Sequence, residues 1–245
     1  MSRKKTAVTA IIIAIMLITG CSSSRESQQP TSQTAEPSAQ PSASASPYTM
    51  GSVTGGARID KRTTSLAPGQ VSYCDLDSAG RAQCARTVLT PSSYAETQKR
   101  PRRPISVSPA GWPSSNPEVQ VGDGYHGRFW SRTNLLPVSL GGEQITKNLF
   151  TGVRTQEVGL RSSWKGELAH AEESAREYLT SQKDDSCPLY YQVSAVYEGD
   201  EMIPRMTQID MLSCDGAVDV HREVYNTAPG WDIDYSTGEI KEKNA

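Results

Sequence analysis

Residues 22–52 restrict what this chain can fold into more than any other segment. They consist mainly of Ser, Gln, Ala, Thr and Pro, with almost no large apolar side chain. Such a segment cannot bury enough surface to offset the entropy that is lost on ordering. We therefore expect a disordered linker over 22–52 and one globular domain over 53–245, whose length of about 190 residues is normal for a single core.

The segment before the linker, residues 1–21, has the composition of a secretory signal peptide. Arg3, Lys4 and Lys5 precede an apolar run over 7–18, which is too short to span a bilayer comfortably. The sequence Ile18-Thr19-Gly20-Cys21 resembles a bacterial lipobox, which implies lipidation of Cys21 and export to the outer face of a bacterial cell membrane. The alternative is a signal peptide that is cleaved without lipidation.

Four cysteines lie in the expected domain: Cys74, Cys84, Cys187 and Cys214. An even number of cysteines in an exported chain favours disulfides. A turn signal over 77–80 separates the first two, so a Cys74–Cys84 bridge across one hairpin and a Cys187–Cys214 bridge are expected, although the sequence leaves three pairings open. A zinc site is the weaker alternative, because no Cys-x-x-Cys pair is present.

Apolar spacing and turn residues predict an α+β fold with antiparallel pairing, since strands and helices do not alternate regularly. A long irregular loop is expected over 101–124, where Pro and Gly are dense. The expected strands cover 70–88 as a hairpin, 148–153, 189–197, 206–214 and 218–225, and the expected helices cover 91–98 and 166–181.

The charge pattern gives only local support for nucleic-acid binding. The formal net charge is −2, which argues against a broad basic footprint. Lys99, Arg100, Arg102 and Arg103 nevertheless form one basic cluster. This cluster is either a solvated loop or a surface that faces phosphates.

Two neighbouring segments carry a family resemblance. They are YHGRFWSRTNLLPVSLGG over 125–142 and NLFTGVRTQEVG over 148–159. Both resemble the DNA/RNA non-specific endonuclease family, and the likeness extends more weakly over most of the domain. The resemblance implies a ββα-metal motif, in which a β-hairpin and a helix hold one divalent ion, and hydrolysis of phosphodiester bonds in DNA or RNA.

The catalytic positions depart from the pattern of that family. Its tetrad reads Asp-Arg-Gly-His or Asn-Arg-Ser-His, and the histidine takes a proton from the attacking water. Here the tetrad is Ser131-Arg132-Thr133-Asn134. A carboxamide accepts hydrogen bonds but is far too weak a base to hold a proton, and loss of a general base costs on the order of a hundredfold to ten-thousandfold in rate.

The resemblance also implies residues for a magnesium ion. The family's metal asparagine falls on Glu157, whose carboxylate is a suitable oxygen ligand. Asn148 and Glu172 match positions that support the metal's hydration shell. Their alternative roles are a turn-stabilising amide and a solvated helix carboxylate.

Other side chains have candidate roles around this centre. His126 is a candidate for a substitute base or a structural histidine, while His170 and His221 are expected to be structural. The expected phosphate contacts come from Arg132, Arg154 and the basic cluster, above all Arg102 and Arg103.

The sequence thus predicts a surface-tethered lipoprotein with a nuclease-like domain whose catalysis is weakened or lost. Its expected partners are DNA or RNA and, through Cys21, the membrane. The alternative functions are a nuclease-derived module that binds nucleic acid or protein without hydrolysis, and a structural lipoprotein of the cell envelope.

Overall fold

The computed structural model of the protein describes residues 51–160 and 165–243. The signal segment, Cys21 and nearly all of the expected linker lie outside these residues. The first strand, β1 (Gly51–Gly55), begins within the last two residues of that linker. Within the described ranges, no helix has both the length and the apolar character needed to cross a membrane.

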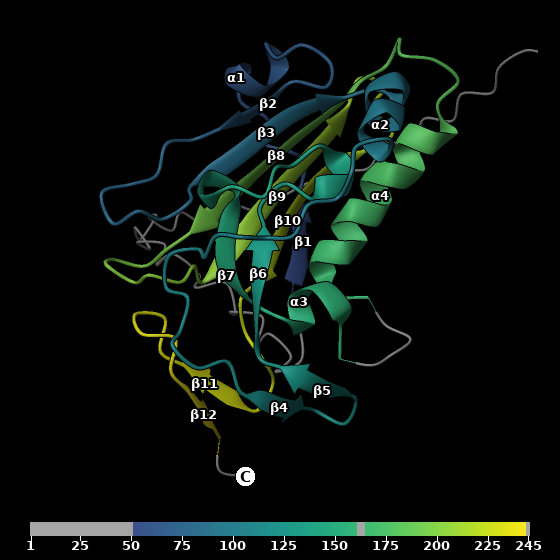
Figure 1. Ribbon diagram of the computed structural model, residues 1–245. Helices are drawn as coiled ribbons and strands as arrows, with labels where there is room; N and C mark the ends of the chain where they lie inside the picture. Colours follow the sequence, from purple (N-terminus) through teal and green to yellow (C-terminus); the bar gives the residue numbers. More distant parts are fainter. Residues whose placement is uncertain (1–50, 161–164, 244–245) are drawn as a thin grey trace, which may run out of the picture. The chain divides into compact units, whose positions relative to one another are not determined.

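A six-stranded antiparallel sheet forms the centre of the fold (Figure 1). This architecture confirms the predicted α+β class. In the central strands, alternate side chains such as Tyr191, Val193 and Ile209 point into one core. In sheet order the strands are β1, β10 (Asp219–Tyr225), β9 (Met206–Ser213), β8 (Leu189–Val196), β3 (Cys84–Leu89) and β2 (Val71–Tyr73).

The long helix α4 (Glu167–Ser181) covers the apolar face of this sheet (Figure 1). Ala171, Ala175, Tyr178 and Leu179 are its buried residues, and they recur at helical spacing. The two alanines let the helix backbone approach the sheet closely. This confirms the helix that was predicted over 166–181, with Gly166 as its N-cap.

The remaining elements are short. Helix α2 (Pro91–Gln98) was predicted, and its capping box between Thr90 and Ser93 explains where it begins. The other elements are α1 (Lys61–Thr64), α3 (Thr155–Val158), two 3-10 turns (Val138–Leu140 and Thr146–Asn148) and three two-stranded pairs: β4 (Glu118–Val121) with β5 (Tyr125–Arg128), β6 (Trp130–Asn134) with β7 (Leu149–Val153), and β11 (Trp231–Ile233) with β12 (Ile240–Glu242).

The prediction of an irregular loop over 101–124 is wrong near its end, because strand β4 occupies Glu118–Val121. Val119 and Val121 alternate with exposed residues and enter a second apolar cluster. Phe129 and Trp231 meet edge to face in this cluster, with ring centroids 5.6 Å apart. The second cluster packs the short strand pairs together.

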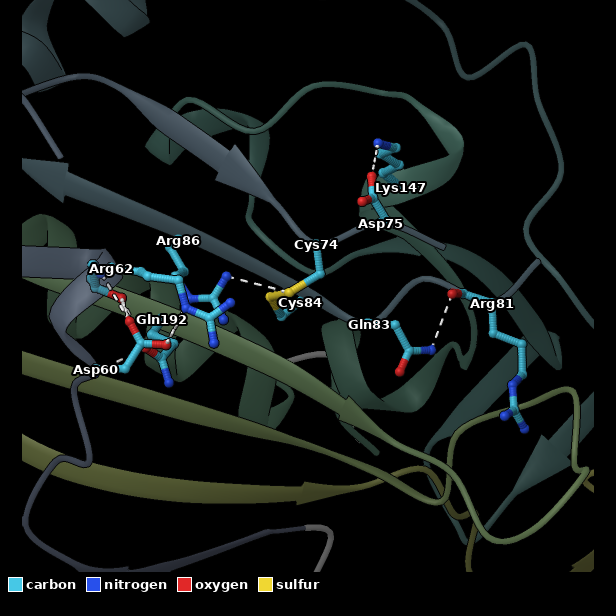
Figure 2. Close-up of a disulfide and its surroundings, with 11 residues drawn as sticks. Asp60, Arg62, Cys74, Asp75, Arg81, Gln83, Cys84, Arg86, Lys147 and Gln192 are labelled. Atoms are coloured by element: carbon cyan, nitrogen blue, oxygen red, sulfur yellow. Dashed lines mark hydrogen bonds and ion pairs between the residues drawn. A yellow bond between two sulfur atoms is a disulfide. The ribbon is translucent and has the colours of Figure 1, made fainter. Parts of the chain in front are cut away.

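Both expected disulfides are present. Cys74 and Cys84 are joined at the end of the β2–β3 hairpin, and Cys187 is joined to Cys214. Figure 2 shows the first bridge, where the Arg86 guanidinium donates to Cys74 Sγ (3.3 Å). The structure therefore selects one pairing out of the three that the sequence left open.

A row of polar side chains crosses the other face of the sheet. Arg86, Gln192, Asp210 and His221 occupy paired positions on β3, β8, β9 and β10. Asp60, the N-cap of α1, binds this row: its carboxylate lies 3.2 Å from Arg86 Nε, and its backbone N–H donates to Gln192 (Figure 2). The polar row thus fastens the segment that follows β1 onto the sheet.

The charge of Asp60 stabilises this attachment. Burial raises the pKa of the Asp60 carboxyl, but the hydrogen bond from the Thr63 backbone and the charge of Arg86 outweigh it, so the pKa is lowered overall. A carboxyl whose pKa is lower in the folded state stabilises the fold above the unfolded pKa of about 4. That contribution is lost as the pH falls through the lowered pKa.

We therefore expect Asp60→Asn, which retains a capping side chain but not the charge, to lower the free energy of unfolding by about 1 kcal/mol at neutral pH. The deficit should vanish as the pH falls through the pKa of Asp60. Urea denaturation across the acid range measures it. Arg62→Ala is the control, because exposed Arg62 lies 3.8 Å from Asp60 and should contribute little. A deficit that stays constant into strong acid would contradict the prediction.

Candidate functional site

The β6–β7 hairpin positions the residues of the tetrad. The two strands pair with Ser131 opposite Gly152 and Asn134 opposite Leu149. A Cβ on Gly152 would lie 2.5 Å from Thr133 Oγ1, so only glycine allows this close approach. The hairpin presents Asn134 at the end of β6.

The buried amide of Asn148 holds the loop of this hairpin. Its Oδ1 accepts from the Leu136 backbone N–H (2.8 Å), and its Nδ2 donates to the carbonyls of Leu136 (3.0 Å) and Glu143 (2.8 Å). Both the oxygen and the nitrogen of the amide are therefore hydrogen-bonded to the protein backbone. Of the two roles considered for Asn148, this geometry matches the turn-stabilising amide.

Asn134 lines a small cavity of about 150 Å³ together with Glu157 and Glu172. Its Nδ2 donates weakly to the Glu143 carbonyl (3.3 Å). The cavity thus brings together three of the predicted site residues, from β6, α3 and α4. Glu157 and Glu172 are the only titratable side chains among the described residues that line it.

A glycine contact brings α3 against the start of α4. Gly166 donates its backbone N–H to the Glu157 carbonyl (3.0 Å), and a Cβ on Gly166 would lie only 2.0 Å from the Gln156 carbonyl oxygen. Glycine is therefore required at this junction. This junction places Glu157, the third residue of α3, and Glu172, the sixth residue of α4, around one cavity.

Glu157 is held by its own neighbours. The Arg154 guanidinium forms an ion pair with Oε2 of Glu157, and the Ser131 hydroxyl donates to the same oxygen (3.1 Å). Glu172 in turn accepts a hydrogen bond from the Ser139 hydroxyl. The ion pair with Arg154 offsets the negative charge of Glu157.

The donor set suits a hard divalent cation of the kind that the resemblance implies. Magnesium is commonly bound by one or two carboxylates, with water and substrate phosphate as its other ligands, and Glu157 and Glu172 could supply the carboxylates. Arg154 would compete with the cation for Glu157. Across residues 51–160 and 165–243, no group of three or more His, Cys, Asp and Glu side chains is placed to hold a metal.

None of the three histidines, all of which are described by the structure, lines the Asn134 cavity. His126 is exposed on β5, opposite Gln120 of β4, and lines neither the Asn134 cavity nor the larger cavity described below. His170 is half exposed on α4. His221 is buried and its Nδ1 lies 2.7 Å from Asp210 Oδ1 in the polar row.

A larger cavity of about 570 Å³ adjoins the other side of Glu157. Arg132 and Arg154, for which phosphate contacts were predicted, line it together with Arg128. Trp112 and Tyr125 also line it and were not predicted as site residues. The one sequence feature that could have indicated Trp112 as a site residue is its position as an aromatic residue in a proline-rich loop.

The basic cluster lies at a separate cavity. Arg100 and Arg103 line this cavity of about 460 Å³, which Gly142 and Ile145 of the β6–β7 loop also border. Arg102 is exposed beside it. The predicted arginines are thus divided between two cavities. Residues of β6 line one of them, and residues of the β6–β7 loop line the other.

Comparison with known proteins identifies the fold. No protein-family model matches the chain. A deoxyribonuclease of Streptococcus dysgalactiae subsp. equisimilis is 32% identical over 117 residues, which are 48% of this chain and 34% of that protein. The chain therefore spans about a third of the length of this curated relative.

Solved nuclease structures superimpose on most of the chain. The Sda1 nuclease, determined with a bound zinc ion, matches with a TM-score of 0.69 and 23% identity over 80% of this chain and 98% of that chain. NucA from Streptococcus agalactiae, determined with a magnesium ion, matches with a TM-score of 0.57 and 18% identity over 77% of this chain and 84% of that chain. The described domain therefore has the α+β fold of these nucleases.

Proposed function

We propose that this chain is an exported, lipid-anchored protein whose nuclease-fold domain binds DNA or RNA and has lost most or all of its capacity for phosphodiester hydrolysis. The single observation that carries the proposal is Asn134, a neutral amide at the position where the mechanism of the resembled family uses a histidine. The deoxyribonuclease relative and the nuclease fold support nucleic acid as the ligand.

The loss of hydrolysis follows from proton chemistry. A water molecule that attacks phosphorus must give up a proton, and a carboxamide cannot take it. A carboxylate is in general a weaker base than an imidazole. The nearby carboxylates of Glu157 and Glu172 each already accept a hydrogen bond from a hydroxyl group of the protein. Among the described residues, the cavity thus offers no efficient replacement for the missing base.

Binding can survive this loss, because it uses different side chains. Arg132 and Arg154 could contact phosphate oxygens next to the cavity of Asn134. Glu157 and Glu172 would hold a magnesium ion, which, when bound, neutralises charge on the phosphate. None of these four side chains needs to exchange a proton in order to bind.

The signal segment and the linker complete the proposal. Lipidation of Cys21 would fix the chain to the membrane, and the part of the predicted linker that precedes β1 would act as a spacer that carries the domain away from the lipid surface. The domain would then meet nucleic acid outside the cell. A module that binds a protein of the envelope is the alternative.

Restoring the base tests the catalytic part. We expect the wild-type domain to cut plasmid DNA with Mg²⁺ slowly or not at all, and Asn134→His to raise the rate on the order of a hundredfold. Asn134→His combined with Glu157→Asn should restore the metal position of the resembled family as well. Gel electrophoresis of the plasmid follows the reaction.

Matched variants make this result interpretable. Asn134→Gln changes the same position without adding a base and should remain as inactive as wild type. Glu172→Gln should abolish any residual wild-type cutting if that carboxylate supplies the base. Rapid cutting by the wild-type domain, at a rate that Asn134→His does not exceed, would disprove the loss of catalysis.

Salt dependence tests the binding part. Phosphate contacts release counterions, so the logarithm of the affinity should fall linearly with the logarithm of the salt concentration, with a slope of about −0.9 per contact on duplex DNA. Arg102→Ala with Arg103→Ala should make this slope less steep if the basic cluster faces phosphates. Fluorescence anisotropy with labelled DNA measures both quantities.

Arg62→Ala is the control for this experiment, because exposed Arg62 lies on α1 and lines none of the three cavities described above. It should leave the slope unchanged. An absence of DNA and RNA binding even at low salt would rule out the nucleic-acid module and favour a partner of another kind.

A further inference from the structure

The 570 Å³ cavity beside Glu157 combines flat aromatic groups with positive charge. Its aromatic lining comes from Trp112, Tyr125 and Trp130, and its cationic lining comes from Arg128, Arg132 and Arg154. Its volume lies within the usual range of small-ligand sites. A ligand that fits this lining has a planar ring and a negative charge.

The three guanidinium groups that line the cavity differ in their ion-pair partners. Arg154 pairs with Glu157, and Arg128 lies 3.7 Å from the exposed Glu118. Arg132, in contrast, has no carboxylate partner among the described residues; its one hydrogen bond is a 3.3 Å contact from Nη2 to the Ser108 hydroxyl. Its Nε is buried and has no partner there either.

The buried Nε of this half-buried arginine is the group that needs an explanation. A buried donor without a hydrogen-bond partner is costly. The Arg132 side chain lies at the edge of a cavity that is large enough for a ligand. An anionic group in that cavity would supply the partner that the protein does not.

Arg132 also forms part of a stacking surface. Its guanidinium lies over the Trp112 ring, 4.4 Å from the ring centroid. The contact keeps the guanidinium beside the indole ring at the cavity that both residues line. Nucleobases stack on arginine planes and on aromatic rings without regard to sequence.

We propose that this cavity binds an unpaired nucleobase together with its phosphate, with the base on the Trp112–Arg132 stack. In a duplex both faces of each base are covered by its neighbours, so only single-stranded or locally unpaired DNA or RNA offers a free base face. The site therefore gives the domain a preference for unpaired strands next to Asn134. This inference rests on the proposed binding of nucleic acid.

Comparison with an abasic strand separates the contribution of base stacking to the affinity from that of charge, because an abasic strand has the same phosphates and no bases. In EDTA, which prevents metal-dependent cutting, we expect wild type to bind short oligothymidylate more tightly than an abasic strand of equal length, by about tenfold. Trp112→Ala should remove this difference and leave binding to the abasic strand largely unchanged. Trp112→Phe, which retains a ring, should preserve much of it.

Further measurements secure the result. Circular dichroism and a thermal melt establish that Trp112→Ala is folded. Tryptophan fluorescence gives a second readout, since a base that stacks near Trp112 should quench the wild-type emission by more than it quenches that of Trp112→Phe. Binding of oligouridylate shows whether the site also accepts RNA.

The outcomes separate this inference from the proposed function. If wild type binds the abasic strand and oligothymidylate equally well, or if Trp112→Ala weakens both equally, the base site is disproved while nucleic-acid binding stands. If wild type binds no strand and no duplex, the proposed function is disproved and the base site with it.

Discussion

The candidate site depends on the buried amide of Asn148. This amide accepts one hydrogen bond and donates two, and these bonds tie Asn148, just before β7, to the backbone of Leu136 and Glu143 in the β6–β7 loop. A buried backbone group that loses its partner costs roughly 1–3 kcal/mol, so the loop has little freedom to rearrange. The positions of Asn134 before the loop and of Glu157 after β7 both follow from this hairpin.

Arg154 offsets the charge that Glu157 places at this centre. An asparagine at the metal position of the resembled family is neutral, whereas Glu157 carries a negative charge. Arg154, three residues earlier on the same turn, forms an ion pair with that charge. Glu172 adds a second carboxylate to the cavity, and the Asn134 amide beside it is not a strong base.

The sequence predicted the elements whose burial is periodic. The helix over 166–181 and the strands near 189–197, 206–214 and 218–225 are present because their apolar spacing matches one buried face. β1 was missed: its residues, GSVTG, resemble the linker, and the strand forms because β10 offers an unpaired edge. β11 and β12 were missed because each has only three residues.

Within the site, the structure brings together residues that the sequence singled out and adds partners that were not predicted. Asn134, Glu157 and Glu172 lie around one cavity, but the short helix α3, in which Arg154 pairs with Glu157 three residues on, was not predicted. Trp112 reaches Arg132 from a loop that has no regular structure. The contact between Trp112 and Arg132 depends on tertiary folding, so a pattern along the chain does not contain it.

The position of β1 has a mechanical consequence. β1 is the edge strand next to β10, and Gly51 at its start packs so closely on Glu167 and the Glu223 carbonyl that a Cβ would lie 2.9 Å from each. In a chain tethered through Cys21, tension from a bound polymer would reach the domain at this strand. A pull along the strand axis loads its hydrogen bonds to β10 in shear, so that they resist together and do not open one at a time.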